Sequence, residues 1–426
     1  MMTKTDYAAV GETLYSTVLP NGLPIFVMPK PGYRKTFAVF ATNYGGADRR
    51  FTLGGEPKNT PAGVAHYLEH KMFDTPEGDA LMRLNATGAD PNAFTSQSMT
   101  AYHFECTDRF EENLRTLLSF VSVPYFTQQS VDKERGIIGQ EIRMYEDAPD
   151  FVVYTDLMKC LFAENPLRDS VAGTVESIAE ITPEVLYDCH RVFYHPSNMA
   201  LCVVGNADPD AVERIAREVL PTERAERPGR DYGPDEGLEP VTARSERRME
   251  VASPLFMIGA KLGPTKTGPD GQRERIVAAL ALRCLCGRSS PFYLRHYSEG
   301  LLNATFGSDL DHAAGQTVVA FEGETPKDPN EVFDALCGEI RRVQRDGFDP
   351  ALFERQKKAL IGGNIRALAN FSGFAVSLAS GCFDGFRTMD SFAVLPTVTC
   401  DEANAWVRDN LVPERFAMSV IYPKED

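Results

Sequence analysis

Residues 61–73 read PAGVAHYLEHKMF, and this stretch decides how the rest of the chain is interpreted. Pro61 stands in the first turn of a predicted helix, where proline is tolerated, and apolar residues follow it at helical spacing. His66 and His70 are four residues apart, so the helix places both imidazoles on one face, about one turn from each other. Two histidines in this arrangement can reach a single metal ion.

Glu69 projects from the adjoining face of the same helix, close to the metal region but poorly placed as a ligand. A carboxylate in that position can take a proton from a water molecule, so Glu69 is the predicted general base. The H-x-x-E-H order inverts the commoner H-E-x-x-H motif of metallopeptidases. The alternative is two locally hydrogen-bonded histidines with an incidental glutamate, which chance supplies in about one chain in a hundred.

A catalytic zinc site with two histidines needs a third protein ligand and an open position for water. Glu134 and Glu141 are candidates on a second predicted helix, residues 131–146. Seven residues are close to two turns, so both carboxylates lie on one face, roughly 10 Å apart along the axis. Only one of them can bind the ion, and the other would hydrogen-bond a histidine or the bound water. For either glutamate alone, a solvated helix face is the ordinary alternative.

The surrounding sequence predicts an α+β domain over residues 1–220, because its strands and helices occur in separate runs. The predicted strands are residues 14–19, 23–28, 37–43, 92–95, 99–106 and 199–204. The predicted helices are residues 61–73, 77–87, 110–121, 131–146 and 209–220, with another that opens at Thr182-Pro183.

Residues 221–242 are rich in proline, glycine and charged side chains, and they are predicted to link the first domain to a second, residues 243–426. The second half repeats the order of elements, with strands within 249–262 and at 318–323 and helices at 272–286, 331–346 and 353–369. Glu354-Arg355 echoes Glu134-Arg135, which indicates two diverged copies. The second copy has no paired histidines, and Ile361 stands seven residues after Glu354, so we expect no metal site there.

The formal net charge of -16 argues against a nucleic-acid surface, because neutralising phosphates requires clustered lysine and arginine. The 43% hydrophobic and 24% charged content is that of a globular protein. No apolar run approaches the ~18 residues of a membrane span. The polar first residues predict no secretory signal.

Nine cysteines are scattered along the chain without a C-x-x-C pair. They predict neither a disulfide framework nor a thiolate zinc site. We therefore expect a reducing compartment, the cytoplasm, with the cysteines packed in the core.

Several segments of the first half resemble the pitrilysin and insulinase family of zinc peptidases, which includes the mitochondrial processing peptidase and insulin-degrading enzyme. They keep the family's order and together are far more specific than the pentapeptide alone. The segments are 19–23 (LPNGL), 44–48 (YGGAD), 65–70 (AHYLEH), 92–96 (NAFTS), 134–147 and 193–199 (FYHPSNM).

By position, the resemblance implies one zinc ion per chain, with His66, His70 and Glu141 as its ligands. It makes Glu69 the base and Glu134 a supporting acidic residue. It also implies two homologous domains, each a mostly antiparallel sheet covered by helices. The expected activity is hydrolysis of extended peptides inside a closed chamber.

Asn92, Ala93, Phe94 and Thr95 look like the family's exposed edge strand, onto which an extended peptide adds through main-chain hydrogen bonds. An ordinary internal strand is the alternative, and only the resemblance favours the edge strand.

The second half is similar to a family segment that carries an arginine and, seven residues later, a tyrosine. Many members use this pair on substrate and on the developing oxyanion. Arg295 is present here and is expected to grip substrate, but Leu302 stands at the tyrosine position. Tyr297 is one turn away, and such misplacement is costly in catalysis. The chain alone therefore lacks a phenol for stabilising the transition state.

Two-domain members of the family typically work in pairs, often with one partner that lacks the metal site. We therefore expect a homodimer, or a heterodimer with a homologous subunit without the metal motif. Two other hypotheses stay open: a catalytically silent or partner-dependent subunit of a peptidase complex, and a zinc lyase acting on a small thioether. The preferred hypothesis is a zinc peptidase, and its expected substrate is a peptide.

Overall fold

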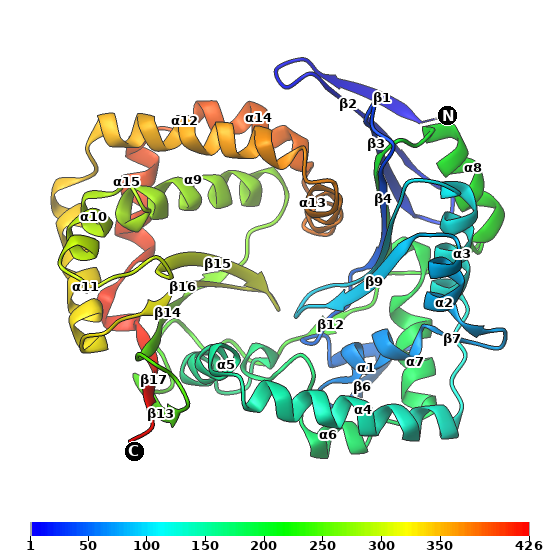
Figure 1. Ribbon diagram of the computed structural model, residues 1–426, viewed down its shortest axis with the longest axis horizontal. Coiled ribbons are helices and arrows are strands. Elements are labelled where there is room, and N and C mark those ends of the chain that lie inside the picture. The colour runs from blue at the N-terminus through cyan, green and yellow to red at the C-terminus, as the bar shows by residue number, and fades with distance from the viewer. Residues whose placement is uncertain (1, 426) are drawn as a thin grey trace. The chain divides into compact units, whose positions relative to one another are not determined.

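A computed structural model describes residues 2–425, which divide into two compact units (Figure 1). The first unit contains residues up to 142 together with 170–232 and 365–389, and the second contains 143–169, 233–364 and the residues from 390 onward. Each unit has a mainly antiparallel sheet covered by helices, which confirms the predicted α+β class. The division into domains 1–220 and 243–426 with a linker at 221–242 stays a prediction.

The first unit is built on a seven-stranded sheet in the order β1-β2-β3-β11-β4-β10-β9. Neighbouring strands are antiparallel except β3 and β11. The strands are β1 (Thr3–Tyr7), β2 (Glu12–Val18), β3 (Pro24–Pro29), β4 (Thr36–Thr42), β9 (Asp90–Thr95), β10 (Thr100–Cys106) and β11 (Met199–Gly205). Every residue of the central strands β4 and β11 is buried. Their mainly apolar sequences are what strands covered on both faces require.

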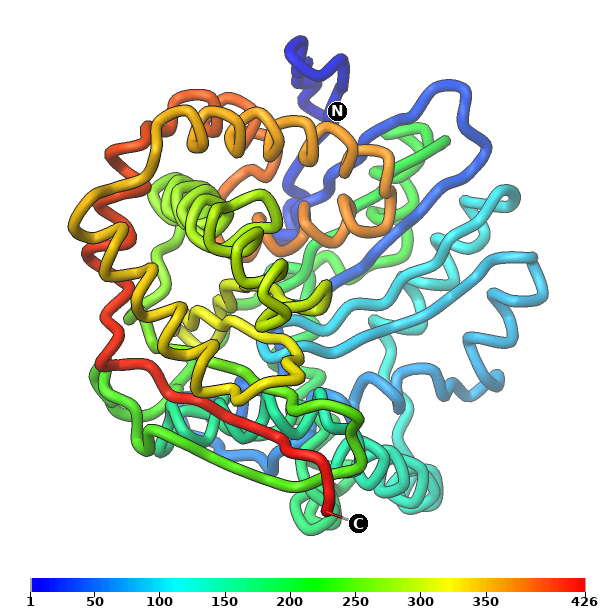
Figure 2. The backbone as a smooth tube through the Cα atoms, turned by 60° about the vertical axis from the view of Figure 1, so that its left-hand side comes forward, coloured from blue at the N-terminus to red at the C-terminus, as the bar shows by residue number. Residues whose placement is uncertain are grey.

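Helices cover both faces of this sheet (Figures 1 and 2). One face carries α1 and α2 near β9, α3 against β4 and β10, and α8 against β3. The opposite face carries α13 over β4 and β11. The helices of this unit are α1 (Val64–Lys71), α2 (Ala80–Ala86), α3 (Phe110–Ser122), α4 (Gln128–Glu146, apart from its last turn), α6 (Val175–Ala179), α7 (Pro183–Phe193), α8 (Pro209–Val219) and α13 (Phe371–Phe383).

Two small sheets complete the first unit. One has the order β12-β5-β6, and the other is the hairpin of β7 and β8. Their strands are β5 (Arg50–Leu53), β6 (Glu56–Asn59), β7 (Asp74–Thr75), β8 (Gly78–Asp79) and β12 (Arg230–Asp231). Because β12 lies within the predicted linker and pairs with β5, part of that segment is built into the first unit.

The second unit is built on a five-stranded sheet in the order β13-β17-β14-β16-β15, in which only β13 and β17 are parallel. The strands are β13 (Arg244–Met249), β14 (Leu255–Pro264), β15 (Gly307–Ala313), β16 (Gln316–Glu324) and β17 (Ala417–Pro423). The helices are α5 (Pro149–Leu161), α9 (Gly268–Cys286), α10 (Pro291–Ser298), α11 (Pro329–Asp346), most of α12 (Pro350–Ala367), α14 (Ser391–Val394) and α15 (Cys400–Asn410).

Side chains alternate across β14 between two helical layers. Phe256, Ile258 and Ala260 belong to the core cluster that includes residues of α9, α11 and α15. Gly259 faces α5 on the other side, where a Cβ would come within 2.8 Å of Leu157. Glycine at this position therefore allows α5 to pack closely on the strand.

Each sheet is thus covered by one helix from the opposite half of the sequence. The helix α5 precedes residue 170 yet packs on β13, β14 and β17, and α13 follows residue 364 yet packs on β4 and β11. Neither helix was predicted from the sequence, nor were α15, β15 and β17. The elements that were predicted are present, with two late starts. The helix α1 begins at Val64, so Pro61 lies before it and not in its first turn. The helix α2 begins at Ala80, where the Asp79 side chain accepts a hydrogen bond from the backbone N–H of Leu81.

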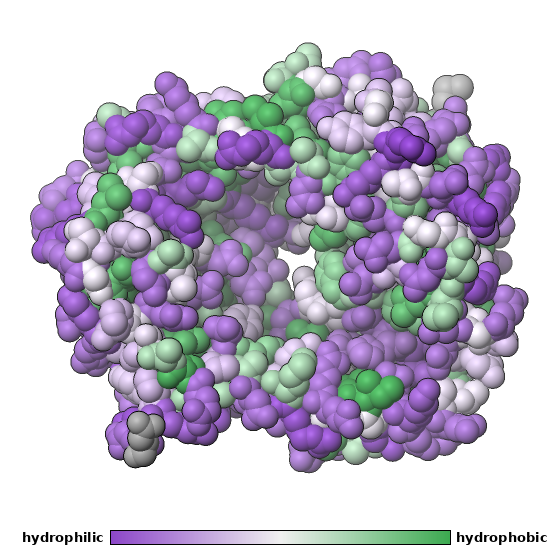
Figure 3. Space-filling model, in the orientation of Figure 1, coloured by the Kyte–Doolittle hydropathy of each residue, from purple (hydrophilic) through white to green (hydrophobic). Residues whose placement is uncertain are grey.

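Polar residues dominate the face shown in Figure 3, in keeping with the 24% charged content. Within residues 2–425, no helix combines the length and apolar character needed to cross a membrane.

The start of α1 is set by Gly63, which has a left-handed φ of 92°. A Cβ at this position would lie 2.5 Å from the carbonyl oxygen of Ala172 and 3.1 Å from Ile178. Glycine therefore permits both the backbone conformation and the close approach that position α1.

We expect Gly63→Ala to destabilise the protein by more than about 2 kcal/mol, because left-handed strain and a clash with backbone act together. Gly88→Ala is the matched control, since Gly88 has a φ of 82° but open space around it. Urea denaturation followed by circular dichroism measures both losses. Equal destabilisation by the two variants would show that contact with Ala172 is unimportant.

Candidate metal centre

The helix α1 is buried on nearly all sides, with Val64, Tyr67 and Leu68 at most 2% exposed. His66 and His70 project together, with ring centroids 4.6 Å apart. Both are on the same face, as their four-residue spacing predicts. Since a buried helix cannot turn about its axis without exposing apolar side chains, the packing of α1 fixes the direction of both imidazoles.

Glu141 approaches both imidazoles from α4. Its Oε1 lies 3.6 Å from Nε2 of His66, and its Oε2 lies 3.6 Å from Nε2 of His70. One donor atom from each of the three residues fits within a 4.8 Å spread. Ligand atoms around a tetrahedral zinc ion are about 3.2–3.6 Å apart, given metal-ligand distances near 2.0–2.2 Å. The three side chains therefore fit one zinc ion, with the histidines offering Nε2.

Glu134 contacts the opposite side of one imidazole. Its Oε1 lies 3.0 Å from Nδ1 of His70, whose Nε2 faces Glu141. The His70 ring therefore lies between the carboxylates of Glu134 and Glu141, which are two helical turns apart on α4. Glu134 therefore contacts a candidate ligand and is not part of the three-residue group, which is the place of outer carboxylates behind metal-bound histidines.

The register between α1 and α4 is held by a buried hydrogen bond, in which the Tyr67 hydroxyl donates to the carbonyl of Val131. Arg135 adds a second anchor for α4 by donating to the carbonyl of Ile181 at 3.2 Å. These contacts do not involve the candidate ligands, so the helices are positioned independently of any ion.

Glu69 is 8% exposed and accepts a hydrogen bond of 2.8 Å from the Thr95 hydroxyl. Burial raises the pKa of Glu69 above its ordinary value, although the charge of His66 and the Thr95 hydrogen bond partly oppose that shift. A carboxylate with a raised pKa is better suited to accept and later release a proton near neutral pH. The sequence pattern gave no signal for the contact with Thr95.

Thr95 ends β9, which is the last strand of the seven-stranded sheet. The strand pairs only with β10 among the described elements, so its other side is a sheet edge. Asn92 is exposed, while Ala93 and Phe94 are half-buried. The segment 92–95 is therefore placed where an added strand would pair, and its role toward a peptide stays a prediction.

Arg295 lies on α10 in the second unit, where its side chain is 72% exposed and pairs with Glu299 at 3.1 Å. Leu302 is 2% exposed and belongs to the core cluster of that unit. Tyr297 is exposed and stacks on Tyr293 with 5.6 Å between ring centroids. Leu302 thus has a packing role at the position where the resembled family segment carries a tyrosine, and the action of Arg295 on substrate stays a prediction.

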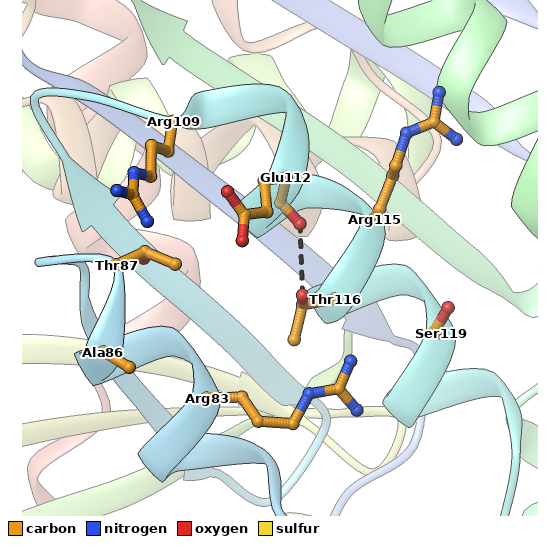
Figure 4. Close-up of a pocket in the computed structure, with 8 residues that line it drawn as sticks. All are labelled: Arg83, Ala86, Thr87, Arg109, Glu112, Arg115, Thr116 and Ser119. Carbon is orange, nitrogen blue, oxygen red and sulfur yellow. Dashed lines mark hydrogen bonds between the residues drawn. The ribbon is translucent and has the colours of Figure 1, made fainter.

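A basic groove of about 620 Å³ between α2 and α3 is separate from this cluster (Figure 4). Two of its three arginines already pair with carboxylates: Arg83 with Glu77 at 2.9 Å and Arg115 with Glu218 at 2.6 Å. Glu112 adds a negative charge to the same wall. Most of the positive charge is therefore compensated.

Family models match most of the chain. The model described as Insulinase (Peptidase family M16) matches residues 55–175. This range includes His66, Glu69, His70, Glu134 and Glu141. The model described as Peptidase M16 inactive domain matches residues 180–360, where we expected no metal site.

Known proteins resemble the chain over its full length. An uncharacterized zinc protease of Bacillus subtilis, YmfH, is 36% identical over 434 residues, covering 100% of both chains. The crystal structure of an M16-like peptidase from Alicyclobacillus acidocaldarius has a TM-score of 0.93 at 33% identity, covering 97% of this chain and 99% of that one. The periplasmic protease PqqL from Escherichia coli has a similar fold, with a TM-score of 0.71 at 17% identity, covering 96% of this chain but 47% of PqqL.

The affinity of the metal-free protein for zinc should fall as the pH falls. Burial by itself lowers the pKa of His70, but the hydrogen bond with Glu134 and the charges of Glu69 and Glu141 outweigh it and raise the pKa above 6.5. Above the raised pKa, zinc meets a neutral imidazole. Below it, zinc must displace a proton, so affinity should drop by about tenfold per pH unit for one proton.

Competition with a chromophoric chelator between pH 6 and 8 measures this affinity. We expect His70→Ala to weaken zinc binding by at least about 100-fold, more than loss of an outer residue typically does. His103→Ala is the control, because His103 is a half-buried histidine of β10 outside the cluster. A pH-independent affinity, or equal losses in the two variants, would contradict the assignment.

Proposed function

The chain belongs to the insulinase family of peptidases, M16, and from that premise we propose that it is a zinc-dependent endopeptidase that hydrolyses extended peptides. The observation that carries the proposal is the meeting of His66, His70 and Glu141 around one point, with Glu69 buried beside them. The naming of the Bacillus subtilis relative as a zinc protease supports zinc as the ion, with one ion per chain.

His66, His70 and Glu141 would hold the zinc ion, which would supply Lewis acidity to the scissile carbonyl and to a water molecule. Glu69 takes a proton from that water as it attacks the carbonyl carbon. The same carboxyl then gives the proton to the leaving amine. The hydrogen bond from Thr95 to one oxygen of Glu69 orients the carboxylate for these transfers.

We propose that the peptide adds as a further strand along Asn92, Ala93, Phe94 and Thr95, at the free edge of β9. Main-chain pairing of this kind favours an extended substrate and tolerates varied side chains. Thr95 belongs to this strand and also contacts Glu69, so the proposed peptide track is directly connected to the base. This connection supports a peptide substrate over a small thioether.

We further propose a cytoplasmic location, because the nine cysteines are scattered without a pairing pattern. Nucleic acid is not among the proposed partners, given the net charge of -16.

We expect Glu69→Gln to lower peptide hydrolysis by about 10²–10⁴-fold, because the amide cannot take the proton from water. Its zinc content should stay that of the wild type, since Glu69 is not a proposed ligand. Mass spectrometry of a digested peptide library, with chelated wild type as a second negative, measures the loss.

Glu112→Gln is the matched control, because Glu112 is an exposed glutamate in the groove between α2 and α3. It should cleave the library as the wild type does. Persistent cleavage by Glu69→Gln or by the chelated enzyme would refute the proposal.

We propose that the active form is a pair of chains, either a homodimer or a heterodimer with a homologous subunit lacking the metal motif. Two observations support a pair. The chain covers 47% of PqqL, so two such chains match the length of that protease. Leu302 is buried at the position where many family members carry a tyrosine.

Dilution should therefore lower the specific peptidase activity, and adding a homologous subunit should restore or raise it if the pair is a heterodimer. Light scattering coupled to size exclusion gives the oligomeric state at each concentration. Full activity of a monomer would rule out the pair.

A further inference from the structure

A nearly enclosed lysine stands directly after the second histidine of the candidate metal centre. The side chain of Lys71 is 2% exposed, and its ammonium group contacts the carboxylate of Asp74. It also lies 3.8 Å from Oε2 of Glu134. Removing an ammonium group from water is costly unless it is paired, and the two carboxylates offset that cost.

Glu134 is held between this lysine and an imidazole. Its Oε2 faces the Lys71 ammonium, while its Oε1 lies 3.0 Å from Nδ1 of His70. A carboxylate with one oxygen directed to each neighbour has a defined position and orientation. The contacts therefore run from Asp74 through Lys71 and Glu134 to the imidazole.

The two histidines differ in how they are held. The side chain of His66 is 11% exposed, and its buried Nδ1 has no hydrogen-bond partner within residues 2–425. The side chain of His70 is 25% exposed, and its Nδ1 contacts Glu134. Packing holds the first ring, whereas the second is less enclosed and has a polar contact that can fix its rotation.

Glu134 and Glu141 are chemically equivalent and lie on the same face of α4, two turns apart. Either carboxylate would suit zinc. The charge of Lys71 attracts Glu134 toward the Nδ1 side of His70, away from the point where Nε2 of His70 and Glu141 meet. A neutral side chain at 71 would remove the buried ammonium group that Oε2 of Glu134 faces.

We infer that Lys71 is a positioning residue, which fixes Glu134 against Nδ1 of His70 and so leaves Nε2 of His70 and Glu141 for the metal ion. The inference rests on the proposed function, because it concerns the same zinc centre. Lys71 acts through Glu134 and touches neither zinc nor substrate.

Lys71→Met tests the inference, because methionine keeps an unbranched side chain but removes the charge. We expect its dissociation constant for zinc, measured by chelator competition, to rise by about 10–100-fold, as for other residues behind a metal ligand. Lys30→Met is the matched control. Lys30 is a second buried lysine of the same unit, with a side chain 8% exposed and paired with Glu12, and its loss should leave zinc affinity unchanged.

A double-mutant cycle separates positioning from general loss of stability. In the Glu134→Gln background, Lys71→Met should change the zinc dissociation constant by less than about twofold, because the residue through which it acts is already altered. The melting temperature of each zinc-free variant shows whether it is folded. If Lys71→Met does not fold, Lys71→Gln takes its place in the same cycle.

Wild-type zinc affinity in Lys71→Met, or the same loss in both backgrounds, would overturn the inference. Neither result would contradict the proposed zinc peptidase activity. Zinc binding by a wild type that cleaves no peptide, either alone or with a homologous subunit added, would overturn the proposed function and leave this inference standing. A wild type that binds no zinc would overturn both.

Discussion

The candidate active site depends on the fixed distance between α1 and α4. At 3.6 Å, the imidazole nitrogens and the oxygens of Glu141 are beyond ordinary hydrogen-bonding range, so Glu141 does not by itself hold the two helices together. Burial of Tyr67 and Leu68 and the hydrogen bond from Tyr67 to Val131 do so. The ligand geometry is thus set by the packing of the fold, as a preorganised metal site requires.

Local sequence was sufficient for the part of the site that lies on one helix. The spacing of His66 and His70 determines a shared face, and the structure has that face. The choice between Glu134 and Glu141 could not be made from spacing, because two helical turns place both on one side. The arrangement that distinguishes them is the position of the His70 ring between the carboxylates, and this depends on how two distant helices pack.

Contacts between distant segments also explain what sequence reasoning missed. The hydrogen bond from Thr95 to Glu69 joins an edge strand to a helix, and no periodic pattern encodes such a contact. Buried strands such as β4 and β11 were found because their residues are mainly apolar. The segment 371–383, FSGFAVSLASGCF, gave no helical signal because small and apolar residues alternate in it without a polar face. Its helical form is favoured by the sheet on which it packs.

The helix α13 comes from the second half of the chain but packs in the first unit, and this has a consequence during synthesis of the protein. The first unit cannot cover both faces of its sheet until residues 365–389 have left the ribosome, when most of the chain has been synthesised. Translation proceeds at about 5–20 residues per second. The apolar face of β4 and β11 therefore stays uncovered by α13 for on the order of ten seconds or longer after β11 is made. The nascent chain therefore carries an unshielded, aggregation-prone surface through much of its synthesis, and chaperones have time to recognise it.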